Sequence, residues 1–184
     1  MKTKEFWDFD ENKNYTTVNI HGINYKVLNI YHDYYTAGLI LDYINNIIVM
    51  ISNYLELNKY SNIYTDYDHK LIECFCDIHP NKHLLSEMQI GTMFYGLNKP
   101  KYLYKSKFTD IGKDGNLRAS YRNVFITLRN KNGRFNDMKE IMKLVIHEIA
   151  HTMCNHVTWR DDNHGKDFKH SEKIIENAYK KIIN

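Results

Sequence analysis

Cysteine is scarce in this sequence, and it contains no long apolar run. The three cysteines among 184 residues are too few and odd in number for a disulfide framework, which favours a reducing compartment. The longest unbroken apolar run, 47–51, has five residues, whereas a membrane-spanning helix needs about 20. The N-terminus also lacks the apolar stretch of a secretory signal. We therefore expect a soluble intracellular protein of the nucleus or cytoplasm, without a membrane partner.

The composition and the hydrophobic pattern predict one α+β domain. A hydrophobic content of 43% with 14% aromatic residues argues against disorder. We expect a polar N-terminal segment, 1–16, followed by a folded domain, 17–184. Alternating apolar residues predict a hairpin over 17–28 with its turn at His21 and Gly22. Helical periodicity predicts helices over 36–57, 66–78, 137–155 and 167–183.

The helix expected over 36–57 carries a polar stripe. The remaining positions of this helix are largely apolar, so we predict a core helix with one solvated edge. The stripe consists of Asp42, Asn45, Asn46, Ser52, Asn53 and Glu56.

The most informative stretch is His147-Glu148-Ile149-Ala150-His151. On a helix, residues four apart lie about 40° apart around the axis, so His147 and His151 project from one face and can bind one zinc ion. Asp137 is a natural N-cap for this helix, with Glu140 three residues on. Its apolar residues recur on the opposite face, which can be buried: Met138, Ile141, Met142, Val145, Ile149 and Met153.

A catalytic zinc site needs a third protein ligand and an open position for water. His156 follows closely, but a continued helix would turn it about 140° away from His151. Glu172 or Glu176 would suit a site completed from a second helix. The pattern favours His164, because the twelve residues after His151 are enough to leave the helix and return. Gly165 allows a tight backbone there, and Phe168 can anchor the return in the core.

The metal motif and its surroundings resemble a family of zinc metalloproteases. His147-Glu148-x-x-His151, followed by His164-Gly165-x-x-Phe168, is similar to the SprT-like and WLM proteases, the group that includes Spartan. Further similarity, to WLM-type proteins of large nucleocytoplasmic DNA viruses, lies in 96–100, 117–120 and 124–129. WLM proteins often have a shorter spacer before the third histidine, so the spacer here favours the SprT-like arrangement. The resemblance implies a zincin-like fold and proteolysis of proteins bound or crosslinked to DNA.

The segment 99–134 is strongly basic. It holds ten Lys or Arg residues against two acids, a net charge of +8, whereas the whole chain carries +3. Basic side chains interleaved with aromatics suit single-stranded nucleic acid, although a solvated sheet edge would look the same. The turn at 112–116 predicts that 102–108 pairs with 118–129, and the latter is expected as the edge strand that binds substrate backbone. The candidate nucleic-acid-binding residues are Lys99, Lys101, Lys105, Lys107, Arg118, Arg122 and Arg129.

The expected chemistry follows from the metal motif. Zinc would lower the pKa of a bound water from about 15.7 toward about 7. Glu148 would act as general base, and Tyr121 or Arg122 could stabilise the oxyanion because of their place on the predicted strand. We expect a monomeric peptidase acting on a protein substrate. Two alternatives remain open: a nucleic-acid-binding module with a structural or idle zinc site, and a general zinc peptidase without a DNA role.

Overall fold

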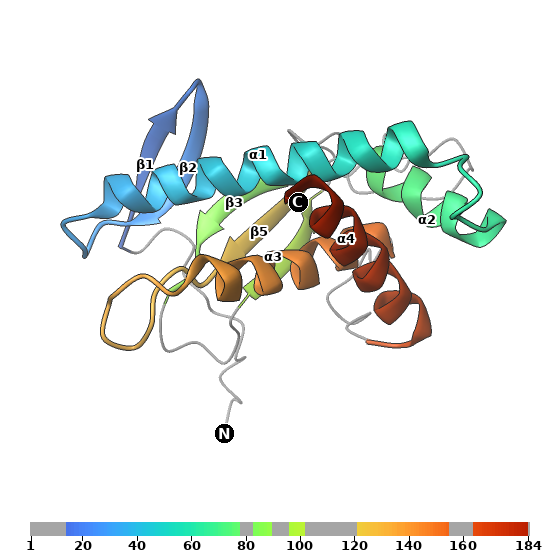
Figure 1. Cartoon of the computed structure of the whole chain (residues 1–184). Helices are drawn as coiled ribbons and strands as arrows, with labels where there is room; N and C mark the ends of the chain where they lie inside the picture. Colours follow the sequence, from blue (N-terminus) through green and yellow to red (C-terminus); the bar gives the residue numbers. More distant parts are fainter. Residues whose placement is uncertain (1–13, 78–82, 90–95, 102–120, 155–163, 184) are drawn as a thin grey trace.

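The structure, a computed structural model, describes residues 14–77, 83–89, 96–101, 121–154 and 164–183. Over these residues the chain forms a five-stranded mixed sheet and four helices (Figure 1), so the α+β prediction is confirmed. The elements in chain order are β1 (Tyr15–Ile20), β2 (Ile23–Leu28), α1 (Tyr34–Asn58), α2 (Asp66–Asp77), β3 (His83–Glu87), β4 (Gly96–Lys101), β5 (Tyr121–Ile126), α3 (Met138–Met153) and α4 (Lys166–Ile183).

The first two strands form the predicted hairpin. His21 and Gly22 connect them and have φ angles of 49° and 83°, the positive values that a two-residue hairpin turn of type I′ requires. The strands pair antiparallel from Ile20 opposite Ile23 to Tyr15 opposite Leu28. The hairpin therefore begins two residues before its predicted start, inside the segment expected to be a polar N-terminus.

The sheet has the strand order β1-β2-β3-β5-β4. β2 pairs parallel with β3, and β3 parallel with β5, whereas β4 pairs antiparallel with β5. The prediction that the strand preceding the metal helix is the edge strand is wrong. β4 lies outside β5, which consequently has a neighbour on both sides. The predicted strand 102–108 lies outside the described residues.

The hydrophobic core lies between one face of the sheet and the helices. Leu85 of β3 pairs with Val124 of β5, so both side chains project from the same face, and both belong to the core cluster. α1, α3 and α4 contribute to the same cluster. Figure 1 shows α1 and α3 running along the sheet, with α4 beside α3. This packing fixes α3, and with it the histidines, relative to β4 and β5.

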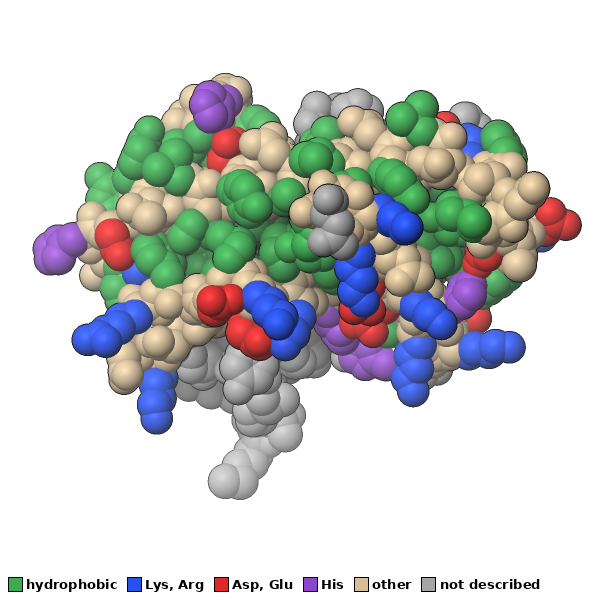
Figure 2. All heavy atoms as spheres, viewed as in Figure 1, with side chains coloured by type: hydrophobic (Ala, Val, Ile, Leu, Met, Phe, Trp, Pro, Cys, Tyr) green, Lys and Arg blue, Asp and Glu red, His purple; other side chains and the backbone are tan. Residues whose placement is uncertain are grey.

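α1 is a core helix, as predicted, but only half of its polar stripe is exposed to solvent. Asp42, Asn45 and Ser52 are buried, while Met50 and Leu57 are exposed. Figure 2 shows hydrophobic side chains over α1 on this face of the protein. The prediction of one wet polar edge is therefore wrong for half of the stripe. By length and composition α1 could cross a membrane, with a mean hydropathy of 1.3, but 56% of that window is buried inside the protein.

Candidate metal centre

α3 begins as its sequence predicts. Asp137 is the N-cap, and its carboxylate accepts a hydrogen bond from the backbone N–H of Lys139 at 2.7 Å. The carboxylate of Glu140 bonds to Lys143 at 2.8 Å. The apolar stripe is buried, with Val145 and Ile149 fully enclosed. Because this stripe packs into the core, the opposite face of α3 presents the two histidines of the motif.

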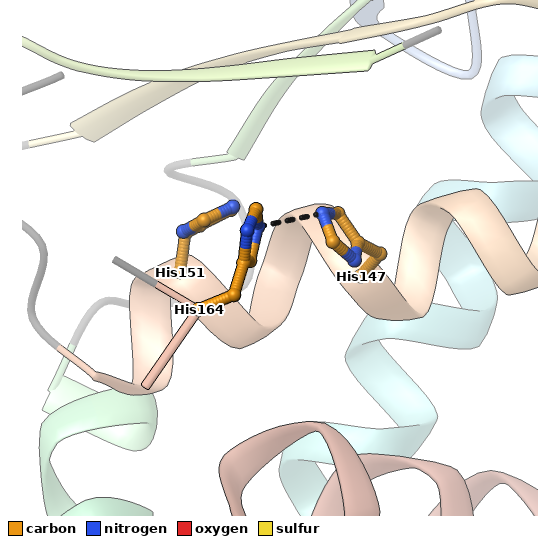
Figure 3. A group of neighbouring side chains, drawn as sticks. All are labelled: His147, His151 and His164. Carbon is orange, nitrogen blue, oxygen red and sulfur yellow. Dashed lines mark hydrogen bonds between the residues drawn. The ribbon is translucent and has the colours of Figure 1, made fainter. Parts of the chain in front are cut away.

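The structure brings His147, His151 and His164 together (Figure 3). One potential ligand atom from each lies within 4.8 Å of the others, and the Nε2 atoms of His147 and His164 are 3.2 Å apart. The first two histidines are half-buried and the third is exposed. His164 lies two residues before the first residue of α4. The prediction that these three residues form one group is confirmed.

The group fits a metal ion by its donor set and spacing. Tetrahedral ligands at the usual zinc–nitrogen distance of about 2.0–2.1 Å lie about 3.3 Å apart, close to the observed 3.2 Å between His147 and His164. Three imidazoles with no fourth protein ligand are typical of catalytic rather than structural zinc sites. Among the described residues the group has three members. Imidazole suits several divalent metals. The geometry therefore shows a group that could hold a metal ion, and zinc as its occupant belongs to the proposal below.

Phe168 of α4 packs against the rings of all three histidines. The ring of Phe168 is 2% exposed, and its centroid lies 4.5 Å from those of His151 and His164 and 4.9 Å from that of His147. This contact confirms that Phe168 anchors the returning chain in the core. The aromatic ring also gives the three imidazoles an apolar support, which limits the ways in which they can turn.

The other candidates for a third ligand take different places. His156 lies outside the described residues. Glu172 lies behind the group, where its Oε1 is 3.2 Å from Nδ1 of His147. Glu176 forms an ion pair with Lys180 at 2.7 Å. Among these three candidates, only Glu172 is shown in contact with the histidine group, and it touches the ring nitrogen that faces away from His164.

Glu148 lies against the edge strand. Its side chain is largely buried, with a residue exposure of 5%. A Cβ atom added to Gly96 of β4 would lie 2.4 Å from Oε1 of Glu148 and 2.9 Å from Cδ. Any side chain at position 96 would therefore collide with this carboxylate. Gly96 is required here for close approach, because only a glycine leaves room for the carboxylate beneath the strand.

Asn98 ties the same strand to the metal helix. Its side-chain amide donates to the backbone carbonyl of Glu148 and, at 3.0 Å, to Oγ1 of Thr152. Its side-chain oxygen accepts from a guanidinium nitrogen of Arg122 at 3.3 Å. Asn98 therefore holds β4 over the turn of α3 that carries Glu148 and both helix histidines.

The backbone of β4 alternates between facing β5 and facing outward. The carbonyl of Ile126 accepts from the N–H of Met88, on the β3 side, at 2.7 Å, so Ile126 does not direct its backbone groups toward its partner Gly96. By alternation, the backbone groups of Gly96 and Asn98 point to the outer side of β4. Pro100 has the same parity and no N–H, as is expected for a proline in an edge strand.

The seven predicted nucleic-acid-binding residues fall into three groups. Arg122 and Arg129 were predicted to contact nucleic acid, but they are 0% and 2% exposed, so this prediction is wrong for both. Of Lys99 and Lys101 the structure describes the backbone, which belongs to β4. Three further candidates lie outside the described residues: Lys105, Lys107 and Arg118.

Arg129 is a structural residue. Its guanidinium bonds to the fully buried carboxylate of Glu87 and to Asp33, each at 2.8 Å. It also lies over the rings of Tyr31 and Phe135, 4.3 Å and 3.9 Å from their centroids. The Arg129 guanidinium beside Asp33 lowers the pKa of that carboxyl. This network joins the start of α1 to β3 and to the segment that leads into α3.

Arg122 faces the core because of the alternation along β5. It has the same parity as Val124 and Ile126, both fully buried, so its side chain enters the protein near α3 and bonds to Asn98. Its buried position excludes the expected direct contact with nucleic acid. The side chain of Tyr121, the other oxyanion candidate, is outside the described part of the structure.

Sequence reasoning missed the roles of Gly96, Asn98 and Glu172. The first two lie in the stretch 96–100 that carries part of the family resemblance, but nothing local in that stretch indicates a contact with α3. Comparison of the chain with protein-family models, with curated proteins and with solved structures finds no match. Function is therefore inferred from the residues and their geometry.

Proposed function

We propose that this protein is a zinc-dependent endopeptidase. The observation that carries the proposal is the convergence of His147, His151 and His164, with Glu148 between the two helix histidines and packed beneath the edge strand. Three imidazole ligands, an adjacent carboxylate and an edge strand are the parts that metal-assisted hydrolysis of a peptide requires. The resemblance of the motif to SprT-like and WLM proteases supports the same reaction.

Glu148 is the proposed general base. A zinc ion bound by the three histidines would supply an acidified water and polarise the scissile carbonyl. Glu148 would accept a proton from the attacking water and deliver it to the leaving nitrogen, a role typically worth about 10²–10⁴-fold in rate. Glu148 is buried beneath Gly96, which restricts the positions that its carboxylate can take, and a catalytic group that is already positioned lowers the barrier to reaction.

β4 is the proposed binding strand for substrate. Its outward backbone groups at Gly96 and Asn98 can pair with an extended peptide by β-augmentation. Both residues also contact α3 at Glu148, so a peptide paired there would lie next to the catalytic carboxylate. Pro100 supplies no donor, which would end this pairing at the C-terminal part of the strand.

We further propose that the substrates are proteins bound or crosslinked to DNA. With Arg122 and Arg129 buried, the segment 99–134 retains eight of its ten basic residues against two acids, a net charge of +6. Lys99 and Lys101 belong to the strand that packs on the metal helix. Basic residues next to the site would keep DNA close to the protein being cleaved.

Metal analysis separates the proposal from a binding module with a structural metal. A structural zinc site is closed by four protein ligands, whereas the histidine group has three members among the described residues. The expected result is one zinc per chain, with water or buffer exchangeable at the metal. Spectra of the cobalt-substituted protein that do not respond to small anions would indicate a closed site and contradict the proposal.

The decisive experiment measures cleavage of a protein crosslinked to single-stranded DNA, with wild type beside Glu148→Gln. The variant should retain zinc and lose about 10²–10⁴-fold in rate. Glu140→Gln is the matched control, because it makes the same change on an exposed position of the same helix, and it should cleave as wild type does. An undiminished rate in Glu148→Gln would refute the mechanism.

The same experiment without DNA tests the substrate class. Cleavage that needs DNA and weakens with salt supports the DNA-linked role, since phosphate contacts are salt-dependent. Glu148-dependent cleavage that is indifferent to DNA and salt would retain the peptidase and refute the DNA-linked role.

A further inference from the structure

The imidazole of His147 uses its two ring nitrogens on opposite partners. Nε2 lies 3.2 Å from Nε2 of His164, on the side of the histidine group (Figure 3). Nδ1 lies 3.2 Å from Oε1 of Glu172 on α4. The ring therefore spans from a carboxylate on one side to the metal position on the other.

This division decides which nitrogen can bind a metal. A neutral imidazole carries one N–H and one lone pair, and the atom that carries the proton is set by the hydrogen bond that it makes. An ionised carboxylate only accepts hydrogen bonds, so Glu172 favours the tautomer with the proton on Nδ1. The lone pair is then on Nε2, the nitrogen that faces His164.

We propose that Glu172 is a positioning residue that orients His147 for metal binding. The inference rests on the proposed zinc site and adds a residue to it. Glu172 and Phe168 are four apart on α4 and so lie on one face of that helix; Phe168 supports the three rings from below, and Glu172 fixes the first of them in rotation. α4 thus completes the site without supplying a ligand from either residue.

The geometry distinguishes this role from direct ligation. Glu172 contacts Nδ1, whereas His147 approaches His164 through Nε2, so the carboxylate lies on the far side of the ring from the group. Its side chain is 38% exposed, and its removal leaves no buried cavity. A substitution there should therefore alter metal binding without unfolding the protein.

Zinc affinity, measured by competition with a chromophoric chelator at neutral pH, tests the proposal independently of activity. Glu172→Ala should weaken zinc binding about 10–100-fold, the usual effect of removing a carboxylate behind a ligating histidine. Glu172→Gln should recover part of this loss, because its amide oxygen can still accept from Nδ1. Glu176→Ala is the matched control, one turn further along α4 and paired with Lys180, and it should bind zinc as wild type does.

The outcomes separate the inference from the proposed function. A wild-type chain that binds no zinc would overturn both. Zinc binding in wild type that His164→Ala abolishes, but that Glu172→Ala leaves within about twofold of wild type, would overturn the positioning role and leave the metal site intact. Equal losses in Glu172→Ala and Glu176→Ala would also overturn it, because the effect would then come from the charge of α4 rather than from contact with His147.

Discussion

Replacing Gly96 with alanine should inactivate the protein without unfolding it. The new Cβ would lie 2.4 Å from Oε1 of Glu148 and 2.8 Å from its Cγ. The colliding atoms are in the side chain of Glu148, which can turn, whereas β4 is held by its pairing with β5. The cheapest response is therefore displacement of the carboxylate. This change would move the proposed general base while leaving the three histidines in place.

The expected loss in rate follows from the distance that the Glu148 carboxylate must move to make room for the new Cβ. Contacts under 3.0 Å are essentially never seen for a real Cβ, and ordinary contact begins at 3.4 Å, so the carboxylate oxygen must move by about 0.6–1 Å. Misplacement of a catalytic group by about 1 Å can cost about 10²-fold in rate, equivalent to about 2.7 kcal/mol of activation free energy. The free energy of unfolding should fall by about 1–3 kcal/mol, the usual cost of overpacking a buried site, which is less than the total stability of about 5–15 kcal/mol of a typical domain.

The assay compares cleavage rate, zinc content and urea unfolding for Gly96→Ala and wild type. We expect an approximately 10²-fold lower rate with full zinc content and a cooperative unfolding transition whose midpoint is only modestly lower than that of wild type. The double variant Gly96→Ala, Glu148→Gln should cleave no more slowly than Glu148→Gln alone, since both changes act through the same carboxylate. A wild-type rate in Gly96→Ala, or losses that multiply in the double variant, would refute the reasoning.

Three further predictions test the metal centre and the fold. His164→Ala should lose stoichiometric zinc while its helical circular dichroism persists; zinc retained at wild-type affinity would mean that another residue is the third ligand. Arg129→Met should lower the free energy of unfolding, measured in urea, by about 3–5 kcal/mol, because it leaves the buried Glu87 carboxylate without its cationic partner. The double variant Arg129→Met/Glu87→Gln should recover part of this loss. Equal stability of wild type and Arg129→Met would contradict the structural role of Arg129. Burial opposes ionisation of Asp68, but hydrogen bonds from Thr65 and His170 outweigh it and lower the pKa of its carboxyl. The ionised Asp68 carboxylate therefore stabilises the fold above the unfolded pKa of about 3.9, and this stabilisation is lost as the pH falls through the folded pKa. The difference in Tm between wild type and Asp68→Ala should consequently become smaller in acid. A Tm difference that is independent of pH would exclude this linkage.

The features that were predicted correctly are encoded over short stretches of chain. The hairpin turn needs two residues with positive φ, and His21-Gly22 lies between two alternating runs. α3 has its N-cap, its buried stripe and its histidine face within 137–154. The spacing of four between His147 and His151 places them on one face of any α-helix. These features depend on backbone geometry, so the sequence alone determines them.

The basic segment shows where charge misled the prediction. Lysine and arginine usually lie at the surface, so their density in 99–134 suggested a binding face. Side chains along β5 nevertheless alternate between the two faces of the sheet, and Arg122 has the parity of Val124 and Ile126. Arg129 is held by Glu87, which lies 42 residues earlier in the chain. Its burial could not be predicted without knowing that β3 passes beside it.

The sequence by itself determined the metal helix and two of the proposed ligands, and it favoured His164 as the third. The tertiary structure decided what surrounds them. Among the described strands, pairing made β4 rather than β5 the edge, and it put Gly96 and Asn98 on Glu148 across separations of about 50 residues. The packing of α4 on α3 put Glu172 behind His147. Such contacts depend on which elements pack together, a choice made by the burial of the whole core and not by any local pattern.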